Sequence, residues 1–139
     1  MSAQTILHAE DDENEAFLLA YALRKRPGLF RLQQVGDGEV AIDYLAGHGQ
    51  FADRFRHPLP AAVLLDLKMP RRNGFEVLEW LRTHPGFERL PVLILTSSER
   101  PEDKARAFQL GATAYLTKSF DWAGIISELE RLLPPPAHA

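Results

Sequence analysis

The chain has 139 residues and a formal net charge of -3, with 45% hydrophobic and 25% charged residues, which suits a single globular domain. The small negative charge argues against a general nucleic-acid binder, because such proteins normally carry a basic face. The chain has no cysteine, which excludes a disulfide framework, a thiolate metal site and a cysteine nucleophile.

Along the chain, five short apolar runs alternate with five stretches of helical character. The runs are typical of buried strands and lie, in chain order, at 5–9, 30–35, 61–65, 91–95 and 114–117. The helical stretches follow them at 13–25, 37–45, 73–84, 98–111 and 122–133. Asp37 can cap the second of these helices, and the fourth begins at either Ser98 or Pro101. This repeated alternation predicts an α/β fold with a mostly parallel sheet that is covered by helices on both faces.

The helices differ in how clearly an apolar face can be identified. The first helix places one set of apolar residues together, namely Phe17, Leu18, Tyr21 and Ala22. The second and third helices turn other sets inward: Val40, Ala41, Tyr44, Leu45, Val77, Leu78 and Leu81. The last helix shows the clearest spacing of three and four, at Trp122, Ile125, Ile126, Leu129, Leu132 and Leu133.

Two segments fall outside these elements. The connection 47–60 has no clear element, and loops of this length are uncommon and often functional or mobile. The tail 134–139 is rich in proline, so it cannot extend the last helix and is expected to be disordered. We therefore predict one domain over residues 1–133 followed by this tail.

Several polar side chains come directly after predicted strands: Glu10, Asp11, Asp12, Asp66, Thr96 and Lys118. The carboxyl ends of parallel strands share one edge of an open sheet, where doubly wound folds bind ligands. We therefore expect these side chains to meet in one shallow pocket. Crowded carboxylates repel one another unless a cation lies among them, and oxygen ligands without histidine or cysteine favour Mg²⁺ or a similar ion such as Mn²⁺.

The same residues indicate a chemistry. A carboxylate such as Asp66, lying beside a metal and a lysine, can act as a nucleophile and form an acyl phosphate. Lys118 supplies a fixed positive charge, and Thr96 supplies a hydroxyl donor for a phosphoryl oxygen. The negative charge that develops would be stabilised by metal, ammonium and hydroxyl together.

Four segments resemble the receiver domain of bacterial response regulators, the chemotaxis-type family. They are ILHAEDD at 6–12, LLDLKMP at 64–70 with Asn73-Gly74, LILTSS at 93–98 and GATAYLTK at 111–118. The resemblance extends from residue 5 to about residue 133. It implies a flavodoxin-like, doubly wound, five-stranded parallel sheet in the order 2-1-3-4-5.

The resemblance also implies roles for individual residues. Asp66 would accept a phosphoryl group from a sensor histidine kinase, and Lys118 would pair with the phosphoryl oxygens. The metal ligands would be Glu10, Asp11, Asp66 and the backbone carbonyl of Lys68. Thr96 would move to bond the phosphoryl group and Tyr115 would swing inward behind it. This movement would change the surface around the fourth and fifth helices and the fifth strand.

A narrower resemblance is to the stand-alone regulators that serve bacterial phytochromes. It rests on the long connection 47–60 and on the amino-acid sequences of segments 68–74 and 95–98. It implies a phytochrome-type histidine kinase as partner and a homodimer formed through the C-terminal elements.

Two positions depart from the family pattern. Ser119 stands where the family usually has a proline after the lysine, often with a cis bond. Because a cis bond before serine would cost about 2.5–4 kcal/mol, the geometry of the Lys118–Ser119 bond is left open. The charge of Lys68, which borders the phosphoryl site, is expected to alter dephosphorylation in a direction that the sequence leaves open.

Taken singly, these residues have plainer explanations. The acidic turn could cap a helix, Ser97 or Ser98 could start one, and Lys118 could be a surface lysine. The pair Arg71-Arg72 is expected to lie in a solvated loop rather than form a docking patch, and His8 to lie in or near the core.

Two other functional classes remain as alternatives. A phosphate-blind receiver that works as a binding module should have lost Asp66, Asp11 or Lys118, and all three are present. A flavin-dependent enzyme of this fold should carry a Ser/Thr/Gly-rich phosphate loop where this chain carries acids. A phosphatase should carry a second acid two residues after its nucleophile, where Lys68 stands. We therefore expect a signalling switch that catalyses only its own phosphotransfer and dephosphorylation.

No targeting or membrane segment is predicted. Residues 1–5 lack the basic region and long apolar stretch of a signal peptide. The longest apolar stretches fall far short of the roughly 18 residues that a membrane-spanning helix needs. Together with the lack of cysteine, these features favour a cytoplasmic protein without a membrane or nucleic-acid partner.

Overall fold

The computed structural model describes residues 3–26, 28, 30–118 and 122–133. Its strands are β1 (Gln4–Ala9), β2 (Phe30–Val35), β3 (Ala62–Leu65), β4 (Val92–Thr96) and β5 (Ala114–Thr117). Its helices are α1 (Glu13–Arg24), α2 (Gly38–Ala46), the 3-10 turn η1 (Gly49–Phe51), α3 (Gly74–Thr83), α4 (Pro101–Gln109) and α5 (Trp122–Leu132). Each of the predicted strands and helices is present, with bounds that differ by a few residues at most.

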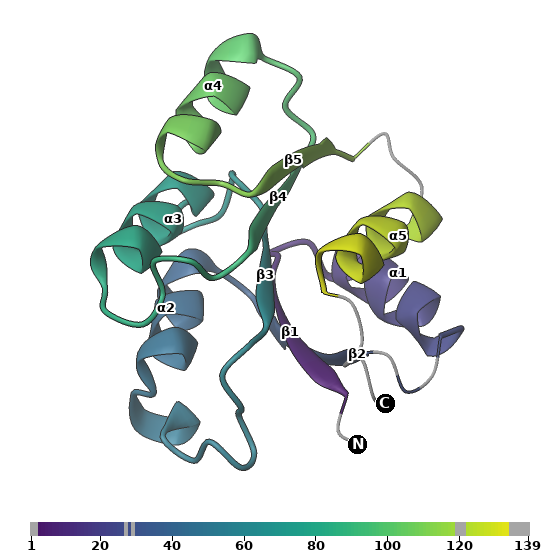
Figure 1. Ribbon diagram of the computed structural model, residues 1–139, viewed down its shortest axis with the longest axis vertical. Helices are drawn as coiled ribbons and strands as arrows, with labels where there is room; N and C mark the ends of the chain where they lie inside the picture. The colour runs from purple at the N-terminus through teal and green to yellow at the C-terminus, as the bar shows by residue number, and fades with distance from the viewer. Residues whose placement is uncertain (1–2, 27, 29, 119–121, 134–139) are drawn as a thin grey trace.

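The strands form one parallel sheet in the order β2-β1-β3-β4-β5, which confirms the predicted fold. Helices α1 and α5 cover one face, and α2, α3 and α4 cover the other (Figure 1). The chain moves outward from β1 to β2 and then returns past β1 to β3. The topological switch point therefore lies between β1 and β3, where this class of fold binds its ligands.

The core consists of two apolar layers, one on each face of the sheet. Strands β3 and β4 are buried along their whole length, as expected for central strands that are covered on both sides. The predicted inward residues of three helices are buried or partly buried, which confirms those faces: Val40, Ala41, Tyr44, Leu45, Val77, Leu78, Leu81, Trp122, Ile125, Ile126, Leu129, Leu132 and Leu133.

The predicted apolar face of α1 is wrong for Phe17, Leu18 and Tyr21, although Ala22 does pack against the core. Phe17 is 60% exposed and Tyr21 is 51% exposed, whereas α1 buries Leu19 and Leu23 against the sheet. Leu19 and Leu23 are four residues apart and so share one helix face. Residues 16–23 are all apolar or aromatic, and such an unbroken run does not reveal which face the helix turns inward.

The long connection 47–60 is more structured than the sequence indicates. It contains η1, and Arg54 within it donates hydrogen bonds to the carbonyls of Tyr44 (2.8 Å) and Leu45 (2.7 Å) near the end of α2. The hydroxyl of Tyr44 donates in turn to the carbonyl of Pro58 at 2.8 Å. These side chains fasten the connection to α2, at the end of the helix opposite the switch point.

Two predictions lie outside the described residues, namely the disordered tail 134–139 and the geometry of the Lys118–Ser119 bond. Within the part of the chain that the structure describes, the helices are too short or too polar to cross a membrane.

Candidate functional site

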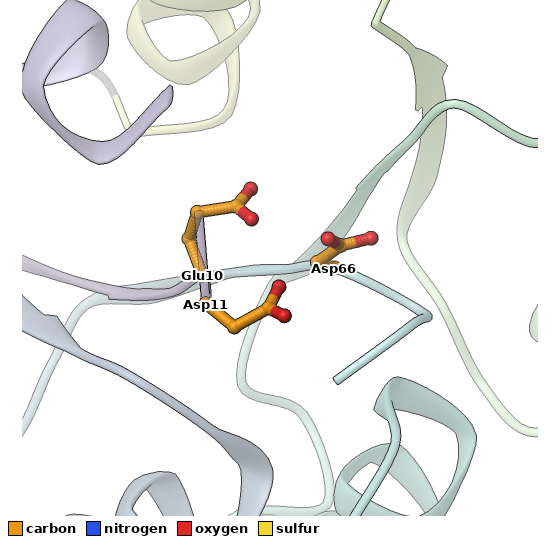
Figure 2. A group of neighbouring side chains, drawn as sticks. All are labelled: Glu10, Asp11 and Asp66. Atoms are coloured by element: carbon orange, nitrogen blue, oxygen red, sulfur yellow. The ribbon is translucent and has the colours of Figure 1, made fainter. Parts of the chain in front are cut away.

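The register of the sheet brings two acidic residues together at the switch point. Ala9 of β1 lies opposite Leu65 of β3, so Glu10 and Asp66 follow at the same edge. The backbone N–H of Asp66 donates to the carbonyl of Ala9 at 3.2 Å, which continues the pairing into the site. In Figure 2 the side chains of Glu10 and Asp11 point toward Asp66.

The three carboxylates form a compact group of oxygen donors. One oxygen each of Glu10, Asp11 and Asp66 lies within 4.8 Å of the others. Glu10 and Asp66 are buried, and Asp11 is exposed. Hard divalent cations prefer such oxygen ligands, so the donor set fits Mg²⁺ or Mn²⁺ and agrees with the grouping expected from the sequence.

The acidic residues that follow β1 have different roles. Asp12 is the N-cap of α1, where its side chain accepts hydrogen bonds from the backbone N–H groups of Asn14 (2.9 Å) and Glu15 (3.2 Å). Glu10 accepts a hydrogen bond from the backbone N–H of Asp12 at 3.1 Å. The carboxylate of Asp12 is therefore occupied by the helix, and Glu10 and Asp11 are left to face Asp66.

Lys118 joins the site from the end of β5. Its backbone N–H donates to the carbonyl of Thr96 at 2.7 Å. Its Nζ donates to Asp66 Oδ2 at 3.1 Å, to Glu10 Oε1 at 3.0 Å and to Glu15 Oε2 at 2.8 Å. Glu15 was not among the predicted site residues. It lies three positions after the N-cap Asp12, where an acid ordinarily indicates a capping box rather than a contact with a distant lysine.

The charges of the site are not balanced by Lys118 alone. The pKa of Glu10 is raised to about 7, mainly by burial and also by the nearby charge of Asp66. Hydrogen bonds from the Asp12 amide and from Lys118 act in the opposite direction. Burial alone would lower the pKa of Lys118, but its hydrogen bonds to Glu15 and Glu10 and the charge of Asp66 raise it above the usual lysine range. Lys118 therefore stays charged among an excess of carboxylates, an arrangement that favours an added cation.

Thr96 and Tyr115 are linked through Ser98. Thr96 is buried at the end of β4, and its hydroxyl accepts a hydrogen bond from the backbone N–H of Ser98 at 3.2 Å. The hydroxyl of Tyr115 donates to the carbonyl of Ser98 at 3.0 Å. Of the two starts proposed for the fourth helix, the structure has Pro101, and the hydroxyl of Ser98 donates to Asp103 at 2.6 Å.

Lys68 lies in the loop that follows Asp66. Its backbone N–H donates to Asp66 Oδ1 at 3.3 Å, and its side chain is exposed. At the other end of this loop, a Cβ on Gly74 would lie 2.3 Å from the carbonyl oxygen of Asp66. Helix α3 can therefore begin this close to the site because residue 74 has no side chain.

Arg71 and Arg72 are exposed loop residues, as predicted, but Arg71 also makes a long-range contact that the sequence does not indicate. The guanidinium of Arg71 forms an ion pair with Asp37, which is buried at the start of α2. Asp37 also caps α2 by accepting from the backbone N–H of Val40 at 2.8 Å, as expected from the sequence. Nothing in the local sequence connects residues 34 positions apart, so this pair could not be predicted from it.

Comparison with known proteins identifies the family. A family model described as the response regulator receiver domain matches residues 6–130. Response regulator Rcp1 of Synechocystis is 32% identical over 116 residues, which are 84% of this chain and 77% of Rcp1. The crystal structure of Mn²⁺-bound Rcp1 has a TM-score of 0.83 and 28% identity, with coverage of 96% of this chain and 97% of that one.

Two further solved structures have similar folds. The phosphorylated cyanobacterial phytochrome response regulator RcpA has a TM-score of 0.84 at 28% identity, covering 94% of this chain and 93% of RcpA. Response regulator RPA3017, described in red light signalling of R. palustris, has a TM-score of 0.81 at 36% identity, covering 93% and 90% of the two chains. The chain therefore belongs to the response regulator receiver family and acts in phosphorylation-based signalling.

Proposed function

We propose that Asp66 is the phosphoacceptor of this receiver and takes its phosphoryl group from a sensor histidine kinase. The observation that carries this assignment is the position of Asp66 at the switch point, with Lys118 Nζ at 3.1 Å and the carboxylates of Glu10 and Asp11 beside it. The backbone N–H of Lys68 holds one oxygen of Asp66. An anchored carboxylate beside a fixed cation is oriented for nucleophilic attack.

We further propose that Mg²⁺ or Mn²⁺ is held by Glu10, Asp11, Asp66 and the backbone carbonyl of Lys68. The oxygen donors and the excess negative charge of the site support this, as does the Mn²⁺-bound structure of the relative Rcp1. When bound, the ion would offset the charge that develops on the transferred phosphoryl oxygens. The role of Glu10 would be exerted through water, as the family resemblance implies.

The residues of this chain then have distinct tasks in the transfer. An oxygen of Asp66 forms a bond to phosphorus while the bond between phosphorus and the kinase histidine nitrogen breaks, giving an aspartyl phosphate. Lys118 pairs with a phosphoryl oxygen and so stabilises the product. Thr96 turns to donate its hydroxyl to another phosphoryl oxygen, and this movement would carry its oxygen away from the backbone N–H of Ser98, from which it now accepts a hydrogen bond.

The proposed switch follows from this last change. Thr96 and Tyr115 are both bonded to Ser98. When Thr96 turns toward the phosphoryl group, the Ser98 backbone and the Tyr115 hydroxyl lose their present arrangement. We propose that Tyr115 then moves inward and that the surface of α4, β5 and α5 changes for a partner protein.

The finer assignments concern the pathway. The phytochrome relative RcpA and the red-light regulator RPA3017 support a phytochrome-type histidine kinase as the partner. A homodimer through the C-terminal elements and a cytoplasmic location, typical of receiver domains, complete the proposal. We propose no turnover of other substrates. Light scattering at two protein concentrations tests the dimer, and phosphotransfer from a purified phytochrome kinase in its two light states tests the partner.

Intact-mass measurement after incubation with acetyl phosphate tests the central assignment. The wild type should gain one phosphoryl group when Mg²⁺ is present and none when it is chelated. Asp66→Asn should gain none, whereas Asp43→Asn, a matched change on the surface of α2, should behave as the wild type. An adduct on Asp66→Asn would refute the assignment. No adduct on the wild type would instead favour a phosphate-blind binding module.

A further inference from the structure

We propose that the ion pair between Arg71 and Asp37 is a positioning device for the metal site, because it fixes the loop that carries Lys68. This inference rests on the proposed function, since the position of Lys68 matters to the ion only if its carbonyl is a ligand. Neither Arg71 nor Asp37 belongs to the proposed ligand set. Their effect would be exerted through the backbone of residues 67–73.

The loop contains a strained backbone turn. Among the described residues, Arg71 is the non-glycine residue with a positive φ, at 66°. The backbone N–H of Arg72 donates to the carbonyl of Pro70 at 2.7 Å, which closes a three-residue turn around Arg71. A side chain at this φ is disfavoured sterically, and such conformations persist when the surrounding structure holds them.

Asp37 supplies the anchor for this turn. Its Oδ2 accepts from Arg71 Nε at 2.9 Å and also from a terminal nitrogen of the same guanidinium. Asp37 is 2% exposed and caps α2 through Val40. Burial alone would raise its pKa, but the hydrogen bonds from the Val40 amide and from Arg71 outweigh burial and lower it. Asp37 is therefore a fixed anion at the junction of β2 and α2.

The turn also packs directly on that junction. A Cβ on Gly38, the first residue of α2, would lie 2.0 Å from the carbonyl oxygen of Arg72. At the start of the loop, the backbone N–H of Lys68 is bonded to Asp66, and at its end the N–H of Gly74 is bonded to the carbonyl of Leu67. The segment that carries Lys68 is thus short and held at both ends. The Arg71 clamp ties its outer part to Asp37, in addition to the packing of Arg72 on Gly38 and the burial of Met69 in the core.

A purely electrostatic role for Arg71 makes the opposite prediction. Arg71 is a cation near a cation site, so its removal should strengthen Mg²⁺ binding if charge alone matters. If Arg71 positions the loop, its removal should weaken Mg²⁺ binding despite that gain. The sign of the change in affinity therefore separates the two roles. The Arg71 side chain is 63% exposed but that of Asp37 is 2% exposed, so Arg71→Ala leaves a buried carboxylate without its cation and needs a second variant that keeps the fold.

Isothermal titration of the full-length protein with MgCl₂ tests the proposal. Arg71→Ala should raise the dissociation constant for Mg²⁺ by about 10-fold, the lower end of the effect of removing a residue that orients ligands. Arg72→Ala removes the same charge from the next residue and should leave the constant within about twofold of the wild type. Equal or tighter binding by Arg71→Ala, or equal weakening by Arg72→Ala, would overturn the proposal.

Asp37→Asn is a second test of the ion pair, in a variant that should keep its fold. Asparagine is as good an N-cap as aspartate, so α2 keeps its cap while the ion pair loses its charge. Asp37→Asn should weaken Mg²⁺ binding, and Asp43→Asn should not. Adding Arg71→Ala to Asp37→Asn should cause no further loss, whereas additive losses would contradict the clamp. If the wild type bound no Mg²⁺, the proposed metal site itself would be wrong. If the wild type bound Mg²⁺ and Arg71→Ala bound it with the same dissociation constant, only the clamp would be rejected.

Discussion

The ammonium group of Lys118 lies 2.8 Å from Glu15 of α1, closer than the 3.1 Å that separates it from Asp66. The lysine that is proposed to pair with the phosphoryl group is thus shared with a carboxylate on a neighbouring helix. Phosphorylation would have to draw Lys118 away from Glu15. Because Glu15 is partly exposed, water can then take the place of Lys118 beside its carboxylate. Glu15 therefore competes with the phosphoryl group for Lys118.

Glu15→Gln should speed phosphorylation of Asp66. The neutral amide holds Lys118 less strongly, so the ammonium is more available to the incoming phosphoryl group. A partly exposed ion pair contributes at most about 1 kcal/mol, which corresponds to a two- to fivefold increase in rate. Time-resolved intact mass with acetyl phosphate and Mg²⁺ measures it, with Glu13→Gln on the same helix as the control. A rate that is unchanged or lower would rule out competition by Glu15.

Lys118→Met should lower stability in the absence of metal and tighten metal binding. Removing the ammonium leaves Glu10 and Asp66, both buried, without their cation, at a cost of about 3–5 kcal/mol. A divalent cation can then replace the missing charge, so the dissociation constant for Mg²⁺ should fall. Thermal denaturation over a series of Mg²⁺ concentrations reports both effects. Weaker Mg²⁺ binding by Lys118→Met would show that the lysine supports the metal site rather than competing for it.

Most of the fold could be predicted because its signals are local. Central strands such as β3 and β4 are short apolar runs bounded by polar residues, and the order of strands and helices then restricts the topology. The inward face of α5 was predicted because polar residues interrupt its apolar pattern. In α1 no such interruption exists between residues 16 and 23, and the exposed residues Phe17 and Tyr21 were assigned to the wrong face.

The site could be predicted as far as strand ends determine it. Glu10, Asp66 and Lys118 follow strands that meet at one edge, so they are brought together without any detail of side-chain packing. The contact of Lys118 with Glu15 spans 103 positions and depends on how α1 lies on the sheet. The clamp by Arg71 likewise depends on a turn whose positive φ is not apparent from an arginine in the sequence.

Glu10→Gln should stabilise the metal-free protein at pH 8. Burial raises the pKa of Glu10 from 4.5 to about 7, so between these values the folded state binds more protons than the unfolded state. Stability from this group therefore falls as pH rises through that window. Because glutamine does not titrate, the stability of Glu10→Gln lacks this dependence on pH. Urea unfolding in EDTA at pH 5 and pH 8 measures it, with Glu39→Gln as an exposed control.

The same unfolding measurements in saturating Mg²⁺ complete the test of Glu10. The ion favours the carboxylate, so the wild type should regain stability at pH 8, whereas Glu10→Gln should gain less. A variant that is less stable than the wild type at pH 8 in EDTA would mean that the hydrogen bond between Glu10 and Lys118 outweighs the burial of the carboxylate.

His8 should impose the opposite slope in nearly the same window. It is 1% exposed in β1, hydrogen-bonded to Gln34 at 3.1 Å, and burial followed by the charge of Lys118 lowers its pKa from 6.5 to about 4. Between these values the unfolded state binds more protons, so stability falls as pH decreases, by up to about 3 kcal/mol. In the metal-free wild type this loss opposes the gain from Glu10, and the two slopes largely cancel between pH 4.5 and 6.5.

Replacing each residue singly should therefore reveal the slope of the other. Glu10→Gln should lose stability as pH falls from 6.5 to 4.5, His8→Gln should gain it, and the double variant should vary least. Urea unfolding in EDTA across this range measures all four proteins. A double variant whose stability falls as steeply with decreasing pH as that of Glu10→Gln would show that another group, and not His8, carries the acid-side loss.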